Sequence, residues 1–181
     1  EISGEGVQLL NNIFLKVKSL LKVPAENYFS SEEFEKKLNL EHLRRSAEEI
    51  VKSEYHYGCD EFGVVIATIA RIKKIPTKYI QCVELISYKT MKSADDINGH
   101  VFLECFLENK KYLVNSTKGT IVEIKKESDK NQLYVIKTIG KRRFYVEVFA
   151  GLDSWDAGIR SHHDLIKVLN EFGEAYFKNT E

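Results

Sequence analysis

The chain lacks an excess of charge of either sign, because its 27 lysines and arginines are matched by 27 aspartates and glutamates. Proteins that bind nucleic acid usually carry a basic excess, so no nucleic acid is expected as a partner. No apolar run approaches the roughly 18 residues of a membrane span, so no membrane is expected either. Proline is scarce, with two residues, whereas 43% of the residues are hydrophobic. This composition excludes a disordered chain and is typical of a single globular domain, here spanning residues 1–181.

Cysteine is also scarce. There are three cysteines, an odd number, and they form no C-x-x-C motif: Cys59, Cys82 and Cys105. A disulfide framework and a structural zinc site are therefore not expected, and no metal or other cofactor is implied. Free thiols fit a reducing compartment and favour the cytoplasm. Secretion stays open, because the sequence begins at Glu1 and a leader could have been removed.

Hydrophobic residues recur at helical spacing in the first half of the sequence and again near its end. This periodicity predicts helices over 7–21, 40–51, 59–72 and 162–177. Ser30 and Glu33 have the spacing of a capping box and predict a further short helix to about residue 38. Asn39 is expected to be the N-cap of the helix that follows.

The second half is rich in β-forming residues, apart from a polar stretch at 87–98 that is expected to be a loop. Strands are predicted at 77–83, 100–107, 112–114, 120–125, 133–139 and 142–149. Helices followed by strands predict an α+β fold, in which N-terminal helices pack on an antiparallel β-sheet.

The residues that could carry chemistry begin with Cys59. It follows Gly58, which interrupts the helical pattern, so it lies at the N-terminus of an apolar helix. The helix dipole and the unpaired N–H groups at that end favour a thiolate and could receive an oxyanion. A nucleophilic cysteine also needs a base, usually histidine, held by a third polar group. His100 begins one predicted strand and Asn115 ends the next, so these two are the candidates.

The expected hairpin tests whether His100 and Asn115 can meet. A turn at Asn109 and Lys110 would pair Glu104 with Asn115 and place Asn115 on the same face of the sheet as His100. In that flat register the two residues lie four positions apart along the strand, roughly 13 Å. Strand twist or a bulge would have to close this gap.

Four segments resemble the transglutaminase-like superfamily. Residues 58–62 (Gly-Cys-Asp-Glu-Phe) and 75–79 (Ile-Pro-Thr-Lys-Tyr) are similar to the family's nucleophile helix and the sequence that ends it. Residues 100–104 (His-Val-Phe-Leu-Glu) resemble its histidine strand, and 112–117 (Tyr-Leu-Val-Asn-Ser-Thr) its closing strand. The resemblance covers about 57–119, and it implies a papain-like fold and a papain-like thiol mechanism.

By this resemblance, Cys59 would be the nucleophile, His100 the general base and then acid, and Asn115 the residue that orients the imidazole. The N–H of Cys59 would form part of an oxyanion hole, and Tyr57 is a nearby candidate for the second donor. The implied activity is attack on an amide carbonyl with formation of a thioester, and the implied partner is a protein or peptide substrate. The sequence indicates no oligomeric state.

Three functions follow from this resemblance. Hydrolysis by a peptidase or amidase is favoured, because nothing in a small single domain is evident that would hold a second, amine substrate. The alternative is a protein-glutamine γ-glutamyltransferase that crosslinks glutamine to lysine. A second alternative is a catalytically inactive binding module on the same fold, because Asn115 stands where the family usually has aspartate.

Two pairs of reactive residues are expected to play no part in the chemistry. Cys82 and Cys105 lie in predicted strands and are expected to be core residues. His162 and His163, at the start of the last helix, are expected to be solvated.

Overall fold

The computed structural model describes residues 2–86, 98–124, 133–138 and 141–178. Its helices are α1 (Gly6–Leu20), η1 (Ala25–Asn27), α2 (Ser31–Glu41), α3 (Ala47–Ser53), α4 (Cys59–Ile72), η3 (Ser154–Ala157) and α6 (His162–Lys178). Its strands are β1 (Val23–Pro24), β2 (Tyr55–His56), β3 (Thr77–Glu84), β4 (Gly99–Leu107), β5 (Lys110–Asn115), β6 (Ile121–Ile124), β7 (Leu133–Thr138) and β8 (Lys141–Gly151). Apart from Asn98, the expected loop at 87–98 lies outside the described residues.

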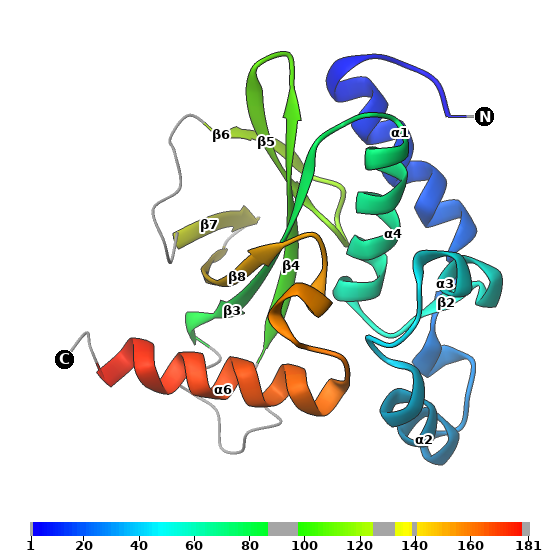
Figure 1. The fold of residues 1–181 in the computed structure, drawn as a ribbon, viewed down its shortest axis with the longest axis vertical. Helices are drawn as coiled ribbons and strands as arrows, with labels where there is room; N and C mark the ends of the chain where they lie inside the picture. The colour runs from blue at the N-terminus through cyan, green and yellow to red at the C-terminus, as the bar shows by residue number, and fades with distance from the viewer. Residues whose placement is uncertain (1, 87–97, 125–132, 139–140, 179–181) are drawn as a thin grey trace.

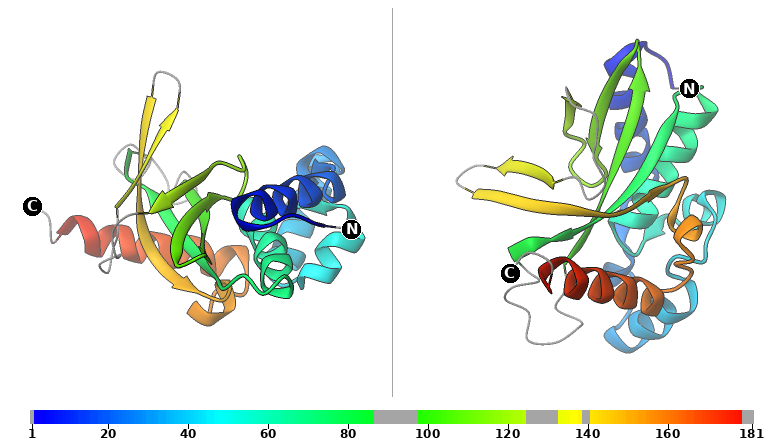
Figure 2. Two further views of the ribbon diagram at one scale, coloured as in Figure 1. Left: turned by 90° about the horizontal axis from the view of Figure 1, so that it is seen from above. Right: turned by 60° about the vertical axis from the view of Figure 1, so that its left-hand side comes forward.

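Six strands form one curled sheet in the order β6-β5-β4-β3-β8-β7, and every neighbouring pair is antiparallel (Figure 1). The short strands β1 and β2 pair separately and in parallel. Helices α1, α3 and α4 gather on one side of the sheet, while α6 runs past the end of the sheet where β4 begins (Figures 1 and 2). The predicted α+β class with an antiparallel sheet is therefore confirmed.

Helix α4 packs closely on the middle of the sheet. A Cβ atom added to Gly63 would lie 2.8 Å from Cγ1 of Val101 on β4, so this contact requires glycine. Phe62 and Ile66 of α4 join Val101 and Leu103 of β4 in the main hydrophobic core. This packing fixes the first turn of α4 beside the beginning of β4.

The two faces of β4 carry different side chains. Because strand residues alternate, Val101, Leu103 and Cys105 face α4, whereas His100 and Phe102 belong to the other face. Cys82 and Tyr145 lie in the second core cluster on that other face. Both Cys82 and Cys105 are buried, as the sequence predicts.

The prediction of a helix over 40–51 is wrong about where that helix begins. The Ser30 capping box is confirmed, but α2 continues through Asn39 to Glu41. The next helix is α3, whose N-cap is Ser46: its hydroxyl accepts the N–H of Glu49, and the Glu49 carboxylate accepts the N–H of Ser46 at 2.7 Å. A reciprocal capping box satisfies two helix-end donors, so it prevails over a lone asparagine.

The expected register of the β4–β5 hairpin is also wrong. The turn consists of Glu108 and Asn109, both at positive φ (51° and 62°), and Leu107 pairs with Lys110. Two-residue hairpin loops favour this conformation, because its twist matches that of the strands. As a result Asn115 pairs with Phe102, so it lies two positions from His100 along the sheet rather than four.

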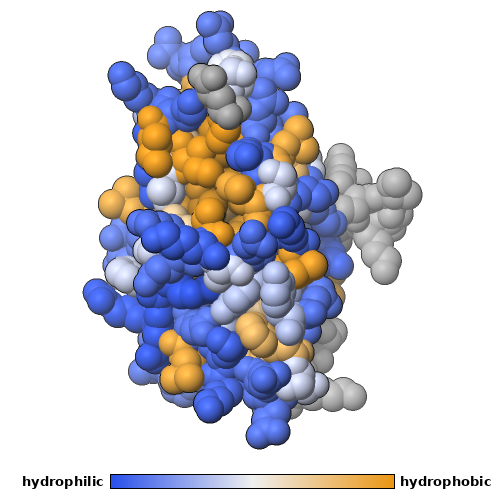
Figure 3. Space-filling model, turned by 90° about the vertical axis from the view of Figure 1, so that its right-hand side faces the viewer, coloured by the Kyte–Doolittle hydropathy of each residue, from blue (hydrophilic) through white to orange (hydrophobic). Residues whose placement is uncertain are grey.

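The outer side of the helical layer carries hydrophobic residues. The space-filling view of this side shows them gathered in its upper half (Figure 3). Exposed apolar side chains of these helices include Val7 and Leu15 of α1 and Ile72 of α4. In the part of the chain that the structure describes, no helix combines the length and apolarity needed to span a membrane.

Candidate active site

The thiol of Cys59 lies at the first residue of α4, as the sequence predicts. Gly58 precedes the helix as its N-cap, and a Cβ atom there would lie 2.8 Å from Oδ1 of Asp60. That carboxylate cannot move aside, because Oδ1 accepts the N–H of Glu61 and Oδ2 is bonded to His42. The glycine is therefore required by close contact with Asp60 rather than by its own backbone angles.

Three backbone groups surround the sulfur. Hydrogen bonds from the backbone of Val101, Cys59 and Asp60 lower the pKa of the Cys59 thiol, but burial and then the Asp60 carboxylate outweigh them and raise it to about 12. Cys59 as a whole residue stays partly exposed, unlike Cys82 and Cys105. The expectation of a thiolate is therefore wrong for the resting site, because burial and a neighbouring negative charge both disfavour it.

The contact with Val101 brings the thiol to an open edge of the sheet. Pairing between β4 and β5 stops at Phe102 and Asn115, so no β5 partner covers the preceding residues of β4. Ser116 bonds to the carbonyl of Val101, at 2.8 Å, and the N–H of Val101 is left for the sulfur. Cys59 thus meets β4 immediately beside His100.

The imidazole of His100 is held by Asn115. The distance from Nε2 of His100 to Oδ1 of Asn115 is 3.2 Å. The same oxygen accepts the backbone N–H groups of Thr117 and Lys118, at 3.2 and 3.1 Å, which identifies it as the carbonyl oxygen of the amide. An amide oxygen only accepts, so Nε2 of His100 carries the proton and Nδ1 carries the lone pair.

The surroundings of His100 keep it neutral. Its ring lies against Phe102 and Tyr145, with centroids 4.7 and 5.4 Å away. Burial lowers the pKa of His100 to about 4, despite the opposing hydrogen bond that its Nε2 donates to Asn115. The resting site therefore holds a neutral imidazole near a protonated thiol. Among the described residues, no hydrogen bond joins the thiol directly to the imidazole, so a thiol–imidazole hydrogen bond is not part of the resting geometry.

Tyr57, the other oxyanion-hole candidate, has both donors occupied. Its backbone N–H donates to Glu61 at 2.9 Å, and its hydroxyl donates to Glu41 at 3.0 Å. Its ring lies against Arg45 and His42. Tyr57 therefore belongs to the polar network behind α4, and it has no free donor for an oxyanion.

That polar network is a feature the sequence reasoning missed. Nε2 of His42 lies 2.6 Å from Oδ2 of Asp60, and Nδ1 of His42 lies 3.2 Å from Nδ1 of His162. Burial lowers the pKa of His42, but Asp60 outweighs burial and raises it. Of the two histidines expected to be solvated, His163 is exposed and His162 is partly buried in this network. The available signal is the pair of acidic residues just after Cys59, since carboxylates at the start of an apolar helix need partners when buried.

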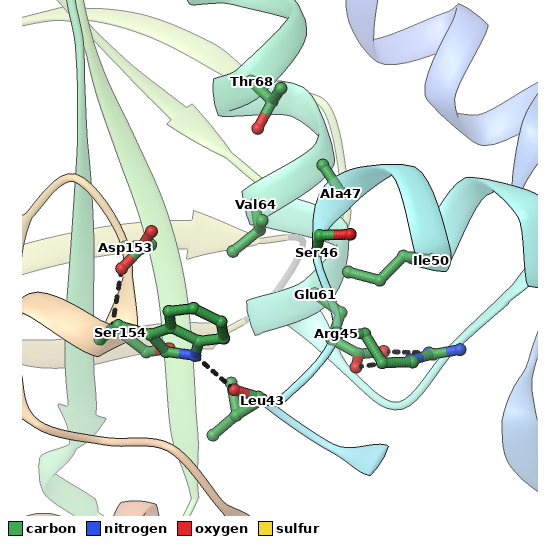
Figure 4. A pocket seen from close by; sticks show the side chains of 11 residues that line it. Leu43, Arg45, Ser46, Ala47, Ile50, Glu61, Val64, Thr68, Asp153 and Ser154 are labelled. Atoms are coloured by element: carbon green, nitrogen blue, oxygen red, sulfur yellow. Dashed lines mark hydrogen bonds and ion pairs between the residues drawn. The ribbon is translucent and has the colours of Figure 1, made fainter.

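The second ion pair of the network lines a cavity. Arg45 holds Glu61 through Nε and Nη2, at 3.2 and 2.6 Å (Figure 4). The cavity, of about 200 Å³, lies between this pair, Val64 and the indole of Trp155. Another, of about 230 Å³, is lined by residues that include His56, Phe62 and Thr117. Cys59 and His100 line neither of them.

Comparison of the chain with known proteins found no matching family model, no similar curated protein and no similar solved structure. The assignment of a function therefore depends on the geometry of the site and on the resemblance of its sequence motifs.

Proposed function

We propose that this protein is a cysteine-nucleophile enzyme of transglutaminase-like, papain-like fold that hydrolyses amide bonds through a thioester. The observation that carries the proposal is the hydrogen bond from Nε2 of His100 to Oδ1 of Asn115, at 3.2 Å, on the strand whose next residue, Val101, has its backbone beside the Cys59 thiol and lowers the pKa of that thiol. Nucleophile, base and orienting amide thus come from one helix start and two paired strands. Protein or peptide amides are the proposed substrates.

The tautomer of His100 defines the proton path. As Sγ of Cys59 attacks the carbonyl carbon, Nδ1 of His100 takes the thiol proton, and the carbonyl oxygen becomes an oxyanion. Nδ1 then gives that proton to the amine as the C–N bond breaks, which leaves a thioester. Nδ1 next takes a proton from water, whose oxygen attacks the thioester. The acid is released as the proton returns to sulfur.

The roles of the uncharged groups follow from this path. Asn115 holds Nε2 protonated, so the lone pair stays on Nδ1 where the thiol needs it. It lends no charge to the imidazolium that forms, unlike an aspartate. The buried rings of Phe102 and Tyr145 keep His100 unprotonated, and therefore able to act as a base, far into the acidic range.

Acylation by p-nitrophenyl acetate tests the proposal, because it reports on the thiol without requiring the natural substrate. We expect release of p-nitrophenolate together with acetylation of Cys59 by mass spectrometry. Cys59→Ala and His100→Gln should lower the rate at least about 100-fold. Cys105→Ala is the matched control, since it removes a buried thiol outside the site, and it should keep the rate.

Two results would overturn parts of the proposal. A rate that does not depend on Cys59 would favour an inactive binding module. Hydrolysis is separated from crosslinking by incubating the protein with a glutamine-containing protein and a fluorescent primary amine. Incorporation of the amine without peptide cleavage would replace the hydrolase by a protein-glutamine transferase.

A further inference from the structure

Gln81 of β3 is a polar side chain that the thiol chemistry described above does not use. It is only 2% exposed, yet it lies on the face of the sheet that packs against α4. It pairs with Val101 across β3 and β4, so it stands opposite the residue whose N–H reaches the Cys59 sulfur. A buried amide at this position needs an explanation, since burial of an unpaired donor is costly.

The orientation of the amide is set by Tyr79. The Tyr79 hydroxyl donates to Oε1 of Gln81 at 3.2 Å, so the carbonyl end is held and the NH₂ end points elsewhere. Burial, followed by the nearby Asp60 carboxylate and Cys59 side chain, raises the pKa of that hydroxyl, so the hydroxyl stays protonated and able to donate. The ring of Tyr79 also lies under α4, since its Cε2 would be 3.7 Å from a Cβ on Gly63.

The NH₂ group of Gln81 lies over the beginning of β4. A Cβ atom added to Gly99 would be 3.2 Å from Nε2 of Gln81. Glycine at 99 thus leaves room directly before His100. Among the described residues, Nε2 of Gln81 donates no hydrogen bond. The side-chain atom that lacks both a hydrogen-bond partner and exposure to solvent in this part of the chain is Oε1 of Glu104, and Nε2 of Gln81 is not such an atom. The NH₂ group of Gln81 is therefore free and not sealed from solvent.

We propose that Nε2 of Gln81 is the second oxyanion donor, acting with the backbone N–H of Cys59, and that Tyr79 positions it. This inference rests on the proposed function. An oxyanion formed at the carbonyl attacked by Cys59 would receive one hydrogen bond from the start of α4 and one from β3. A neutral donor suits this site, because a cation there would favour a thiolate, which the resting site does not hold.

The test compares two reactions of the same thiol. Acetylation by p-nitrophenyl acetate passes through an oxyanion, whereas alkylation by iodoacetamide does not. We expect Gln81→Met, which keeps the side-chain length, to slow acetylation of Cys59 about 100-fold while alkylation stays within about twofold of wild type. Tyr79→Phe should slow acetylation less and also spare alkylation. Gln8→Met, at an exposed position of α1, is the matched control and should change neither rate.

The outcomes separate this inference from the proposed function. If wild-type acetylation does not depend on Cys59, the proposed function fails, and the donor role fails with it. If it does depend on Cys59 but Gln81→Met acetylates at the wild-type rate, only the donor role is overturned. Equal slowing of both reactions would also overturn it, because Gln81 would then act on the thiol itself.

A measurement on the wild type covers the case in which Gln81→Met does not fold. The aldehyde N-acetylglycinal adds to a thiol and gives a hemithioacetal whose oxygen mimics the oxyanion. In ¹⁵N-labelled protein, we expect the side-chain NH₂ resonances of Gln81 to shift on addition of the aldehyde, and those of Gln8 to stay. Hemithioacetal formation at Cys59 without a shift at Gln81 would contradict the proposal.

Discussion

Two imidazoles flank the first turn of α4, and their partners differ by one charge. His42 meets the carboxylate of Asp60 at 2.6 Å, and His100 meets the carboxamide of Asn115 at 3.2 Å. Burial lowers the pKa of both histidines. Asp60 reverses that effect for His42, whose pKa is raised, whereas Asn115 does not, and the pKa of His100 falls to about 4.

The comparison shows how neighbouring sites on one helix turn acquire different roles. A charged pair of His42 and Asp60 fastens the turn between α2 and α3 to the start of α4. A neutral His100 remains free to take a proton. Both imidazoles are substantially buried, so the difference comes from the neighbouring charges: His42 is bonded directly to the Asp60 carboxylate, whereas Lys118 and Arg143 oppose the protonation of His100 and outweigh the weaker effect of Asp60 there.

Asp60→Asn should have the largest effect on stability. The variant keeps the shape of the side chain but removes the charge that holds His42 protonated, and breaking a buried pair costs about 3 kcal/mol or more. We expect the free energy of unfolding in urea at pH 6 to fall by about that amount. The pKa of the Cys59 thiol should fall as well, because the Asp60 carboxylate raises it.

The control for Asp60→Asn is Glu48→Gln. Glu48 and Lys52 form an exposed ion pair at 2.6 Å, and such pairs contribute less than about 1 kcal/mol. If Asp60→Asn lowered the free energy of unfolding no more than this control, the ion pair with His42 would not stabilise the packing of α4. The structural role given to His42 would then be wrong.

The position of the nucleophile was predictable from local sequence, because Gly58 interrupts a helical pattern just before an apolar helix. The partner of Asp60 was not, since His42 is 18 residues away and its place depends on where α2 ends. His42 is the C-cap of α2, and the capping box at Ser46, which a prediction based on Asn39 overlooks, starts the next helix only after it.

The meeting of His100 and Asn115 was predictable only in part. Alternation along the strands gives the shared face correctly. The register does not follow from the sequence, because the two-residue turn at Glu108 and Asn109 lacks the glycine that usually marks such turns. Burial of His100 between rings from distant strands, including Tyr145, is likewise beyond local patterns.

Asn115→Asp should give His100 a carboxylate partner, as Asp60 is for His42. A carboxylate beside the imidazole favours its protonated form, so the pKa of His100 should rise from about 4 by roughly one to three units. The rate of acylation by p-nitrophenyl acetate should decline on the acidic side of its pH profile as His100 is protonated. We expect this acid limb of the profile to move to higher pH by the same amount. Asn109→Asp, in the exposed turn, is the control and should leave the limb in place. An unmoved limb in Asn115→Asp would mean that the limb does not report on His100.

The two histidines should also give opposite dependences of stability on pH. The pKa of His42 is raised above 6.5 in the folded protein, so its stabilisation is complete below pH 6.5 and is lost as pH rises through the folded value. The pKa of His100 is lowered to about 4, so between pH 6.5 and 4 the unfolded chain takes up the proton and stability falls. Asp60 adds no change in this window, because its lowered pKa acts below its ordinary 3.8.

Urea unfolding at several pH values tests this opposition. The deficit of His42→Gln against wild type should be larger at pH 5.5 than at pH 9. His100→Gln should lose less stability than wild type between pH 6.5 and 4. Parallel curves for the wild type and both variants would show that neither histidine has a different pKa in the folded and unfolded states.

The smallest effect is expected at the β4–β5 turn, which sets the register that brings Asn115 to His100. Glu108 and Asn109 both adopt positive φ, which costs a non-glycine residue free energy, and Asn-Gly is the preferred pair for such turns. Replacement of Glu108 by Asn together with Asn109 by Gly should therefore raise the free energy of unfolding by about 0.5 kcal/mol. The acid limb of acylation should not move, because the register and the hydrogen bond from His100 to Asn115 are kept. A shift of that limb in the turn variant would show that the neutral histidine depends on strand register as well as on the charge of its partner.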